Sequence, residues 1–488
     1  MKISWQTLLP GCLAILLLIT LGACSGTVNS NTLSNPSSTD VAATSTPSPT
    51  PDAGGAAGAS YTYVRNNQVW IVAHNTPAKQ ITNFNYSQMS PAPTVSFDQP
   101  LWFAHGRFLV IKMRASNQGG VGGSCGSTVT LGQLSTLMVY DTITAKLQPI
   151  LLPGDRKPDP NAYDGQWSYI FQQDDTHLLA WHLANGNAQA GLYRVDMTQL
   201  MPATSTGTAG ATGTLTPQLL VAAGRLTNST NNLGTPVATS TSTPTNQATP
   251  TVQGTPTVQG TLAYHLQTMP MRYANHTLYY QTVQDLGNQR SNLAIYRIAI
   301  DDPLAQAQEV TDMGTIQVCV PSAGNNNTPG TFVEPGWDVS PNGQYLAVQK
   351  VTADDASNHT SQLFLMKLSK AQTTTLGTSP RWATSLLNQA VRIFWSPDNK
   401  NIMIESTQST AAGNYLLLSV NSANLSAITT YSITNLGMIT WKGNGPQFAL
   451  YSTQPYSAAM TGNIVTYQLG KPTGQLLIPA ASSFAWSD

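Results

Sequence analysis

A short sequence motif, which predicts a strand, a tight turn and a second hydrophobic strand, recurs along the C-terminal part of the chain. Its three clearest copies surround the turn positions Gly343, Asn399 and Gly445, which lie 56 and 46 residues apart. Asn-Gly and Asp-Asn pairs tolerate positive φ angles, so they can reverse a chain within two residues. A unit of about 40–50 residues with four strands is typical of a β-propeller blade. The repeat therefore predicts an all-β fold.

Looser copies of the motif extend the repeat toward the N-terminus. They lie at 101–110, 173–181 and 272–280, and another unit opens at 61–64 without a first strand. The last residues, 483–488, resemble a first strand whose partner strand is missing. Because antiparallel folds avoid open sheet edges, we predict that this C-terminal strand completes the first unit and closes a ring of seven four-stranded blades. A pair of β-sandwiches would account for the short strands but not for the recurring motif.

Two of the repeat units resemble a known propeller family. The motif Trp395-Ser396-Pro397-Asp398-Asn399 and its sibling Ser340-Pro341-Asn342-Gly343 are similar to the TolB-type propeller repeat, which is WD-repeat-like. The resemblance covers about 61–488 and implies a β-propeller domain over these residues. It implies no particular activity, because propellers with such repeats serve many unrelated roles.

The first 24 residues have the composition of an export signal. Lys2 supplies a positive charge, and the apolar stretch 8–21 is shorter than the ~18–20 residues that cross a bilayer. It ends in Leu21-Gly22-Ala23-Cys24, which resembles the lipobox of bacterial lipoproteins. The resemblance implies that residues 1–23 are a signal peptide and that Cys24 carries a lipid, which would anchor the protein in the cell membrane, facing outside the cytoplasm. A plain secretory signal or an uncleaved anchor is the alternative.

Three stretches are too polar and too rich in Ser, Thr and Pro to build a core. Residues 24–60 predict a disordered tether between the lipid and the folded domain. The stretches 204–216 and 235–261 predict low-complexity insertions in surface loops, since long loop insertions cost little free energy. The second contains the hexapeptide Thr-Pro-Thr-Val-Gln-Gly twice in tandem, at 249–254 and 255–260, which indicates local duplication.

Charge excludes one class of partner. Charged residues make up only 9% of the chain, and 22 Lys and Arg residues balance 22 Asp and Glu residues. Binding to nucleic acid or to an acidic membrane surface needs a cluster of uncompensated positive charge. We therefore expect no nucleic-acid partner, and contact with the membrane only through the N-terminal lipid.

Two cysteines, Cys125 and Cys319, remain once Cys12 is assigned to the signal and Cys24 to the lipid. In an exported protein they form either a disulfide or two unpaired thiols. No Cys-x-x-Cys spacing is present, so we expect no cysteine-based metal site. The segment 122–126 matches the nucleophile pattern Gly-x-Ser-x-Gly, but no helix is predicted after it to present the serine.

The seven histidines do not form a metal-binding pattern. His177 and His182 are five residues apart, so on one strand they face opposite sides. His105, His177 and His276 fall at or beside the turn after a first strand, where a polar residue is expected anyway. We therefore predict no catalytic residue, no metal and no cofactor.

The ten tryptophans could suggest a platform for a carbohydrate. Four of them, however, hold repeat positions: Trp337, Trp395, Trp441 and Trp486. A side chain that recurs with the blade is expected to pack between blades. We predict packing for these four.

Together these features favour a non-catalytic binding or scaffold module whose ligand is an unknown protein, peptide or glycan. The alternative is a propeller enzyme (a hydrolase, a lyase or a quinone-dependent oxidase) with a site built from scattered residues. The two hypotheses differ in what should line the central channel. A cluster of His, Arg and Asp would favour the enzyme, whereas Ser, Thr and aromatic side chains would favour binding.

Overall fold

A computed structural model describes most of the predicted propeller, within a compact unit that spans Pro49–Asp488. The described residues are 60–66, 68–72, 76–83, 95–115, 135–153, 155, 167–182, 189–200, 215–226, 271–287, 290–317, 336–354, 359–368, 373–375, 391–406, 413–420, 425–433, 438–443, 445–451, 462–471 and 473–487. The signal sequence, residues 24–59 of the predicted tether and all four cysteines lie outside these residues, and Ser60 is the first residue of a strand.

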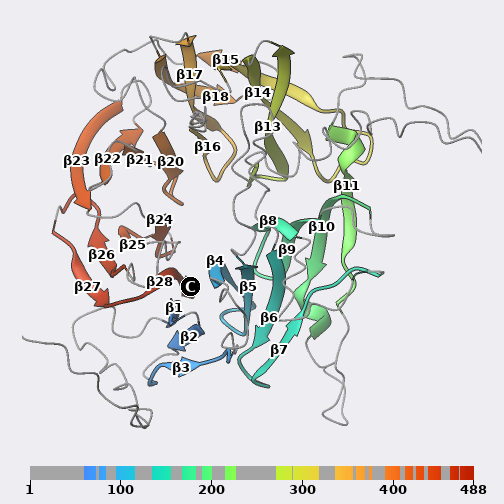
Figure 1. The fold of residues 1–488 in the computed structure, drawn as a ribbon, viewed down its shortest axis with the longest axis vertical. Helices are drawn as coiled ribbons and strands as arrows, with labels where there is room; N and C mark the ends of the chain where they lie inside the picture. The colour runs from blue at the N-terminus through green and yellow to red at the C-terminus, as the bar shows by residue number, and fades with distance from the viewer. Residues whose placement is uncertain are drawn as a thin grey trace, which may run out of the picture. The chain divides into compact units, whose positions relative to one another are not determined.

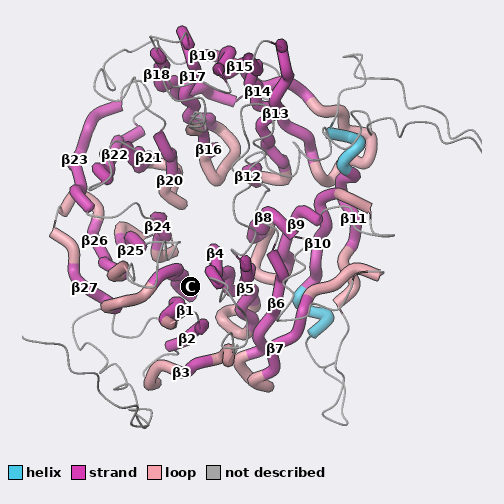
Figure 2. The backbone as a smooth tube through the Cα atoms, viewed as in Figure 1, coloured by secondary structure: helices cyan, strands magenta, loops and turns pink. Residues whose placement is uncertain are grey.

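The described residues form a seven-bladed β-propeller, as the sequence predicts (Figure 1). Each blade is an antiparallel sheet of four strands, and the tube view shows almost no other regular structure (Figure 2). Two short 3-10 helices, η1 (Met197–Leu200) and η2 (Ala223–Leu226), follow two strands of blade 3. Within the described ranges, no helix has the length and hydrophobicity required to cross a bilayer.

The first three blades hold the N-terminal strands and the C-terminal one. Blade 1 contains β28 (Ser482–Ser487), β1 (Ser60–Arg65), β2 (Gln68–Val72) and β3 (Lys79–Gln80). Blade 2 contains β4 (Val95–Phe103), β5 (Phe108–Ala115), β6 (Ser135–Asp141) and β7 (Lys146–Pro149). Blade 3 contains β8 (Trp167–Gln172), β9 (His177–His182), β10 (Gly191–Asp196) and β11 (Gln218–Ala222). A single bridge, Ser135 to Trp167, joins blades 2 and 3 into one continuous sheet.

The other four blades each use consecutive strands. Blade 4 contains β12 (Met271–Ala274), β13 (Thr277–Gly287), β14 (Arg290–Ala299) and β15 (Gln308–Gln317). Blade 5 contains β16 (Trp337–Val339), β17 (Tyr345–Asp354), β18 (His359–Leu368) and β19 (Thr373–Thr375). Blade 6 contains β20 (Val391–Trp395), β21 (Asn401–Ser406), β22 (Gly413–Val420) and β23 (Leu425–Ile433). Blade 7 contains β24 (Met438–Trp441), β25 (Gln447–Tyr451), β26 (Ile464–Gln468) and β27 (Gln475–Ile478).

The Ser-Pro turn explains why the repeat motif is so regular. In blade 5 the hydroxyl of Ser340 accepts a hydrogen bond from the backbone N–H of Tyr345 at 2.9 Å and donates one to Asn342 Oδ1 at 2.8 Å. Gly343 takes the left-handed conformation that reverses the chain, with φ 68°. In blade 6, Ser396 makes the same kinds of contact. A short polar motif therefore specifies the turn locally.

The last strand closes the ring, as predicted from the missing first strand of blade 1. β28 pairs antiparallel with β1, with Tyr61 opposite Trp486 and Tyr63 opposite Phe484. Phe484 is fully buried and its ring meets the Trp486 ring edge-on, with centroids 4.7 Å apart. This pairing gives blade 1 its innermost strand and leaves no first strand without a partner sheet.

Seven clusters of buried hydrophobic side chains hold the blades together, one at each interface between neighbouring blades. Strand β9 shows how one strand serves two interfaces. Leu178 and Ala180 pack toward blade 2, whereas Leu179 and Trp181 pack toward blade 4. Because both faces of a blade are covered, its second strand is apolar at consecutive positions instead of alternating.

The predicted role of the repeat tryptophans is confirmed by these clusters. Trp337, Trp395 and Trp486 each belong to an interface cluster, and Trp441 packs against another. The predicted insertions fall in connections, one between β10 and β11 and the other between β11 and β12. Of their residues, 204–214 and 235–261 lie outside the described part of the chain.

Candidate ligand-binding channel

The first strand of each blade lies next to the central space of the ring (Figure 1). These seven strands are β28, β4, β8, β12, β16, β20 and β24. The first strand of blade 4 contacts those of blades 3 and 5, and the first strand of blade 1 contacts those of blades 7 and 2. The seven first strands therefore form the wall of a channel.

One position of the first strand can be compared across all seven blades. In each blade, the last residue of the first strand that bonds to the second strand is taken as the reference, and the position lies two residues before it. In blade 5 the reference is Ser340 and the position is Asp338. We call the seven residues at this position the inner ring: Ala485, Leu101, Phe171, Arg272, Asp338, Phe394 and Thr440. All are half-buried except the small Ala485, which is buried. The inner ring is thus largely aromatic, aliphatic or Thr, with one charged pair.

Arg272 and Asp338 form that charged pair between blades 4 and 5. Arg272 Nε donates to Asp338 Oδ1 at 3.0 Å, and Arg272 Nη1 donates to the carbonyl of Met271 at 2.9 Å. The guanidinium carbon also lies 5.4 Å from the centre of the Trp337 ring, within cation–π range. These contacts hold the guanidinium in one orientation at the channel wall.

Asp338 joins three consecutive blades. Its Oδ1 also accepts from the backbone N–H of Val339 at 3.0 Å, and its Oδ2 accepts from the backbone N–H of Trp395 in blade 6 at 3.0 Å. Burial raises the pKa of Asp338, while Arg272 and these two N–H groups oppose the rise by stabilising the carboxylate. A carboxylate occupied by three donors is poorly placed to act as a general acid or base.

Arg272 retains donors that the described residues do not use. A guanidinium has five N–H groups, and the contacts above engage one on Nε and one on Nη1. Among the described residues, no acceptor contacts Nη2. The side chain is 38% exposed, against 15% for Asp338, so the guanidinium is the more accessible partner of the pair.

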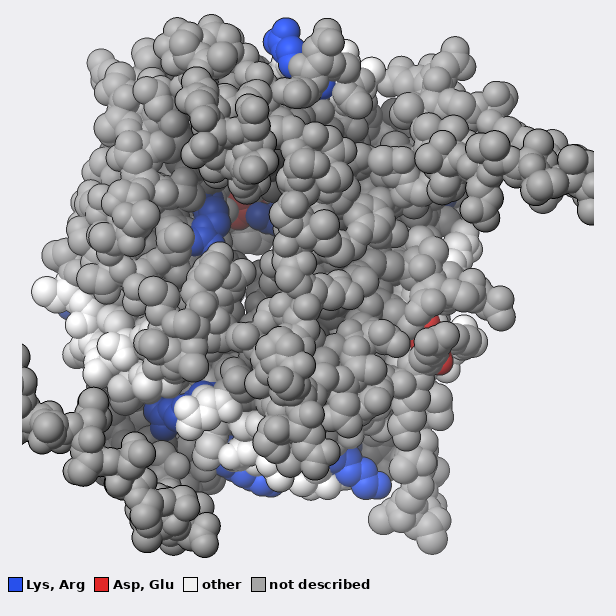
Figure 3. All heavy atoms as spheres, in the orientation of Figure 1, with Lys and Arg blue, Asp and Glu red and all other residues white. Residues whose placement is uncertain are grey.

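A further charged side chain lies on the first strand of blade 6. Arg392, on β20, is half-buried and stands opposite Glu405 in the strand register. In the space-filling view, blue and red atoms lie together in the hollow at the centre of the ring (Figure 3). The channel is therefore charged on the side of blades 4 to 6.

Aromatic rings pack where blade 3 meets blade 4. Phe171 is stacked on Tyr169, with centroids 6.4 Å apart and planes 5° from parallel, and it lies 6.4 Å from the Tyr273 ring. Phe394 occupies the corresponding ring position in blade 6 and packs against the blade 6–7 cluster. The inner-ring residues of blades 3 and 6 are thus aromatic and pack at interfaces between blades.

The histidines noted in the sequence are not in the inner ring. His105, His177 and His276 lie at turns, each beside an aspartate, at 3.4 Å from Asp175, 2.8 Å from Asp174 and 2.6 Å from Asp301, respectively. The positive φ of His105 and His276 is consistent with the predicted turn role. None of the three meets a channel-wall carboxylate.

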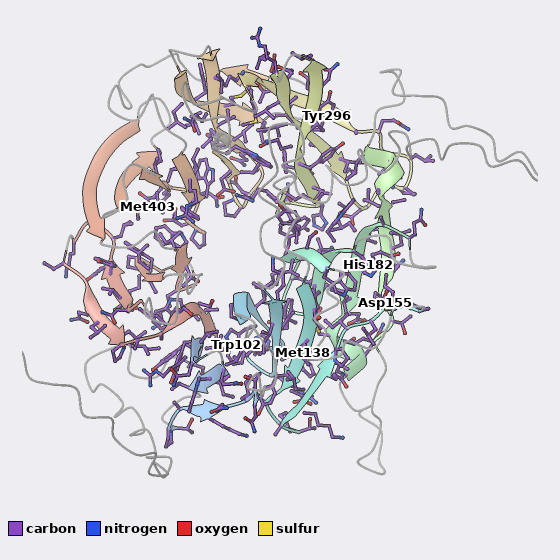
Figure 4. The ribbon with its side chains drawn as sticks, viewed as in Figure 1. Trp102, Met138, Asp155, His182, Tyr296 and Met403 are labelled. Carbon is purple, nitrogen blue, oxygen red and sulfur yellow. The ribbon has the colours of Figure 1, made fainter. Side chains whose placement is uncertain are left out.

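His182 forms a buried pair with Asp155 in blade 3 (Figure 4). Its Nε2 is 3.2 Å from Asp155 Oδ1, and neither side chain has exposed surface. Burial lowers the pKa of His182, and the Asp155 carboxylate opposes that shift. The rings of Trp167 and Tyr193 meet the imidazole edge-on. No substrate could reach this pair without the blade opening.

Sequence reasoning missed the Arg272–Asp338 pair, although both residues lie in recognised repeat units. Both are charged residues on the first strands of neighbouring units, in a chain where charge is rare. In the described part of the chain, no group of three or more His, Cys, Asp or Glu side chains could hold a metal ion.

Comparisons with known proteins agree on the fold alone. No family model and no curated protein matches this chain. It is similar to the periplasmic gluconolactonase of Pseudomonas aeruginosa, at 12% identity and a TM-score of 0.39 over 88% of this chain and 98% of that one. It is also similar to the β-propeller domain of the trilobed protease of Pyrococcus furiosus, at 8% identity and a TM-score of 0.40 over 86% and 94% of the two chains. Likeness at this level does not transfer an activity.

Proposed function

We propose that this chain is a membrane-anchored extracytoplasmic lipoprotein with a TolB-like propeller that binds a ligand in its channel and does not turn it over. The inner ring carries this proposal. It combines aromatic and aliphatic side chains with one salt bridge, and it contains no histidine. Its single carboxylate is already occupied by three donors. Such a wall offers contacts for binding but no evident proton-transfer group.

Localisation rests on the N-terminal sequence. The pattern Leu21-Gly22-Ala23-Cys24 after an apolar stretch supports lipid attachment at Cys24, with residues 24–60 as the tether. Substituting Cys24→Ala should release the protein from the membrane fraction or leave an unprocessed precursor. A variant that fractionates and migrates as the wild type does would rule out the lipid anchor.

Binding without turnover is tested with the full chain. Affinity capture from intact cells, followed by mass spectrometry, should recover a ligand with the wild type and recover less with Phe171→Ala, which removes an inner-ring surface. The purified protein should not turn over any substrate in panels for peptidases, glycosidases, esterases and lyases. Turnover that disappears on substituting His177, His182 or His276 would overturn the proposal in favour of the enzyme.

A further inference from the structure

We propose that the closing strand β28 is a strained latch, which detaches from β1 while the rest of the propeller stays folded. The inference concerns the ring itself and does not depend on what the channel binds. β28 is one of the seven first strands around the central space, and it contacts those of blades 7 and 2, β24 and β4 (Figure 1). Its detachment therefore opens the channel wall between these two strands.

The latch differs from the other first strands in how it is connected. In each of blades 2 to 7 a turn joins the first strand to the second, as residues 340–344 do in blade 5. β28, in contrast, follows β27 of blade 7 in the chain, and its partner β1 begins at Ser60. No turn resists the separation of β28 from β1, so the pair can open locally without disturbing a hairpin.

Strain is built into the strand at Ser483. This residue has a positive φ of 49°, a conformation that is costly for a residue with a Cβ atom. Nine non-glycine residues in the described part of the chain have positive φ, and of these only Ser483 is buried and lies within a strand. It is the extra residue of a β-bulge, because Val64 of β1 stands opposite Ser482 and Tyr63 opposite Phe484. Glycine is the residue best suited to a bulge position with this conformation.

The side chain of Ser483 adds a second cost. It is fully buried, and its hydroxyl has no hydrogen-bond partner among the described residues. A buried polar group without a partner keeps its desolvation penalty, which is released when the group returns to water. The strain and the buried hydroxyl both disfavour the closed state alone, so both favour opening.

Aromatic side chains oppose this cost and keep the ring closed most of the time. Phe484 and Trp486 are buried and belong to the cluster between blades 7 and 1. Trp486 also lies edge-on to the ring of Tyr61 on β1, with centroids 6.1 Å apart. The closed state therefore predominates, and the strain at Ser483 sets how often the strand opens.

The chain just before the latch is held on blade 7. The backbone N–H of Ala480 donates to Asn463 Oδ1 at 3.1 Å, and that of Ala481 donates to the carbonyl of Gly462 at 2.7 Å. These two contacts do not involve β1, so they persist when β28 separates from it. The moving part is thus β28 itself.

The test is hydrogen–deuterium exchange of the full chain in non-ionic detergent, measured by mass spectrometry. In the wild type, amide protection in β28 should be at least about tenfold lower than in β9, a largely buried strand of blade 3. Sub-denaturing urea should accelerate exchange in β9 more than in β28, because a local opening exposes less surface than global unfolding does.

Two glycine variants separate the latch from strain elsewhere. Ser483→Gly removes the strain and the buried hydroxyl, so it should slow exchange in β28 at least about threefold. Ala145→Gly is the matched control, because Ala145 also has a positive φ, of 55°, but lies in the exposed turn between β6 and β7. It should leave exchange in β28 unchanged.

A third variant separates the two costs at Ser483. Ser483→Ala keeps the positive φ and loses only the hydroxyl, so it should slow exchange in β28 less than Ser483→Gly does. Equal protection in β28 and β9, or unchanged exchange in β28 of Ser483→Gly, would overturn the inference. Either result would leave the proposed binding function standing, whereas turnover of a panel substrate would remove that function and leave the latch.

Discussion

The two faces of the propeller are built differently. The connections between first and second strands, such as 340–344 and 396–400, are short and lie on one face, which we call the turn face. Those between second and third strands and from one blade to the next start and end on the opposite face, and they include the long sequence intervals 116–134, between β5 and β6, and 223–270, between β11 and β12. Most of the long connections are thus on one side of the ring. Insertions and deletions should be tolerated better on that side than on the turn face.

Polar contacts between neighbouring blades hold the turn face together. The backbone N–H of Asn342 in blade 5 donates to Asn399 Oδ1 in blade 6 at 2.9 Å. Likewise, the backbone N–H of His105 in blade 2 donates to Asp175 Oδ2 in blade 3 at 3.1 Å. Substitutions here should therefore lower stability, whereas length changes on the opposite face should not.

The largest effect is expected where the ring closes. Deleting residues 483–488 removes most of β28 and exposes the apolar surface of β1 and of blade 7 that Phe484 and Trp486 cover. Buried apolar surface stabilises by about 25 cal/mol per Å². We expect a strong drop in melting temperature or aggregation, measured by differential scanning calorimetry and light scattering. An unchanged melting curve would contradict the closure.

Lys112, on β5, should make stability depend on pH. Its ammonium is buried and donates to the carbonyl of Ser168 at 2.7 Å, and burial lowers the pKa of Lys112 to about 8. The unfolded chain, with a pKa near 10.4, then binds more protons between these values. The free energy of unfolding should therefore rise as pH increases from about 8 to about 10, by up to about 3 kcal/mol.

Denaturant titrations at several pH values measure this slope. The variant Lys112→Met keeps the aliphatic stem and should lose the rise. Because tyrosines such as Tyr280 have a raised pKa in the folded state, the wild type should lose stability again above the range in which Lys112 acts. A rise of equal size in Lys112→Met would assign the effect to another group.

A smaller effect is expected for a single turn-face contact. Asn399 adopts φ 61° and its side chain accepts from Asn342, so Asn399→Ala should cost about 2 kcal/mol through backbone strain and the lost hydrogen bond. The variant Asn399→Gly keeps the conformation and loses only the hydrogen bond, so it should cost less. Urea denaturation compares the two; equal costs would show that strain contributes nothing.

The smallest effect is expected on the opposite face. Deleting one hexapeptide copy, 249–254, shortens the connection between β11 and β12 without touching a strand. Loop-closure entropy changes slowly with length, so the free energy of unfolding should change by less than about 0.5 kcal/mol. The same urea titration checks this, and a loss as large as that of Asn399→Ala would contradict the difference between the faces.

Much of the fold could be predicted because its signals are local. The Ser-Pro turns of blades 5 and 6 are specified by side chains within five residues of one another, as the contacts of Ser340 show. The closing strand could be predicted for another local reason, since one unit lacked a first strand and the chain ended with one. The buried pairing of Trp486 opposite Tyr61 confirms that prediction.

By itself the sequence determined the number of blades, their turns and the closure of the ring, because repeat spacing and turn chemistry act over a few residues. Only the tertiary structure decided which side chains meet at the channel wall. Arg272 and Asp338 lie 66 residues apart in the chain and reach 3.0 Å only because blades 4 and 5 are neighbours. The same holds for Asp155 and His182, whose burial depends on packing around blade 3. Contacts between blades depend on the rotation of one sheet against the next, which no local pattern encodes.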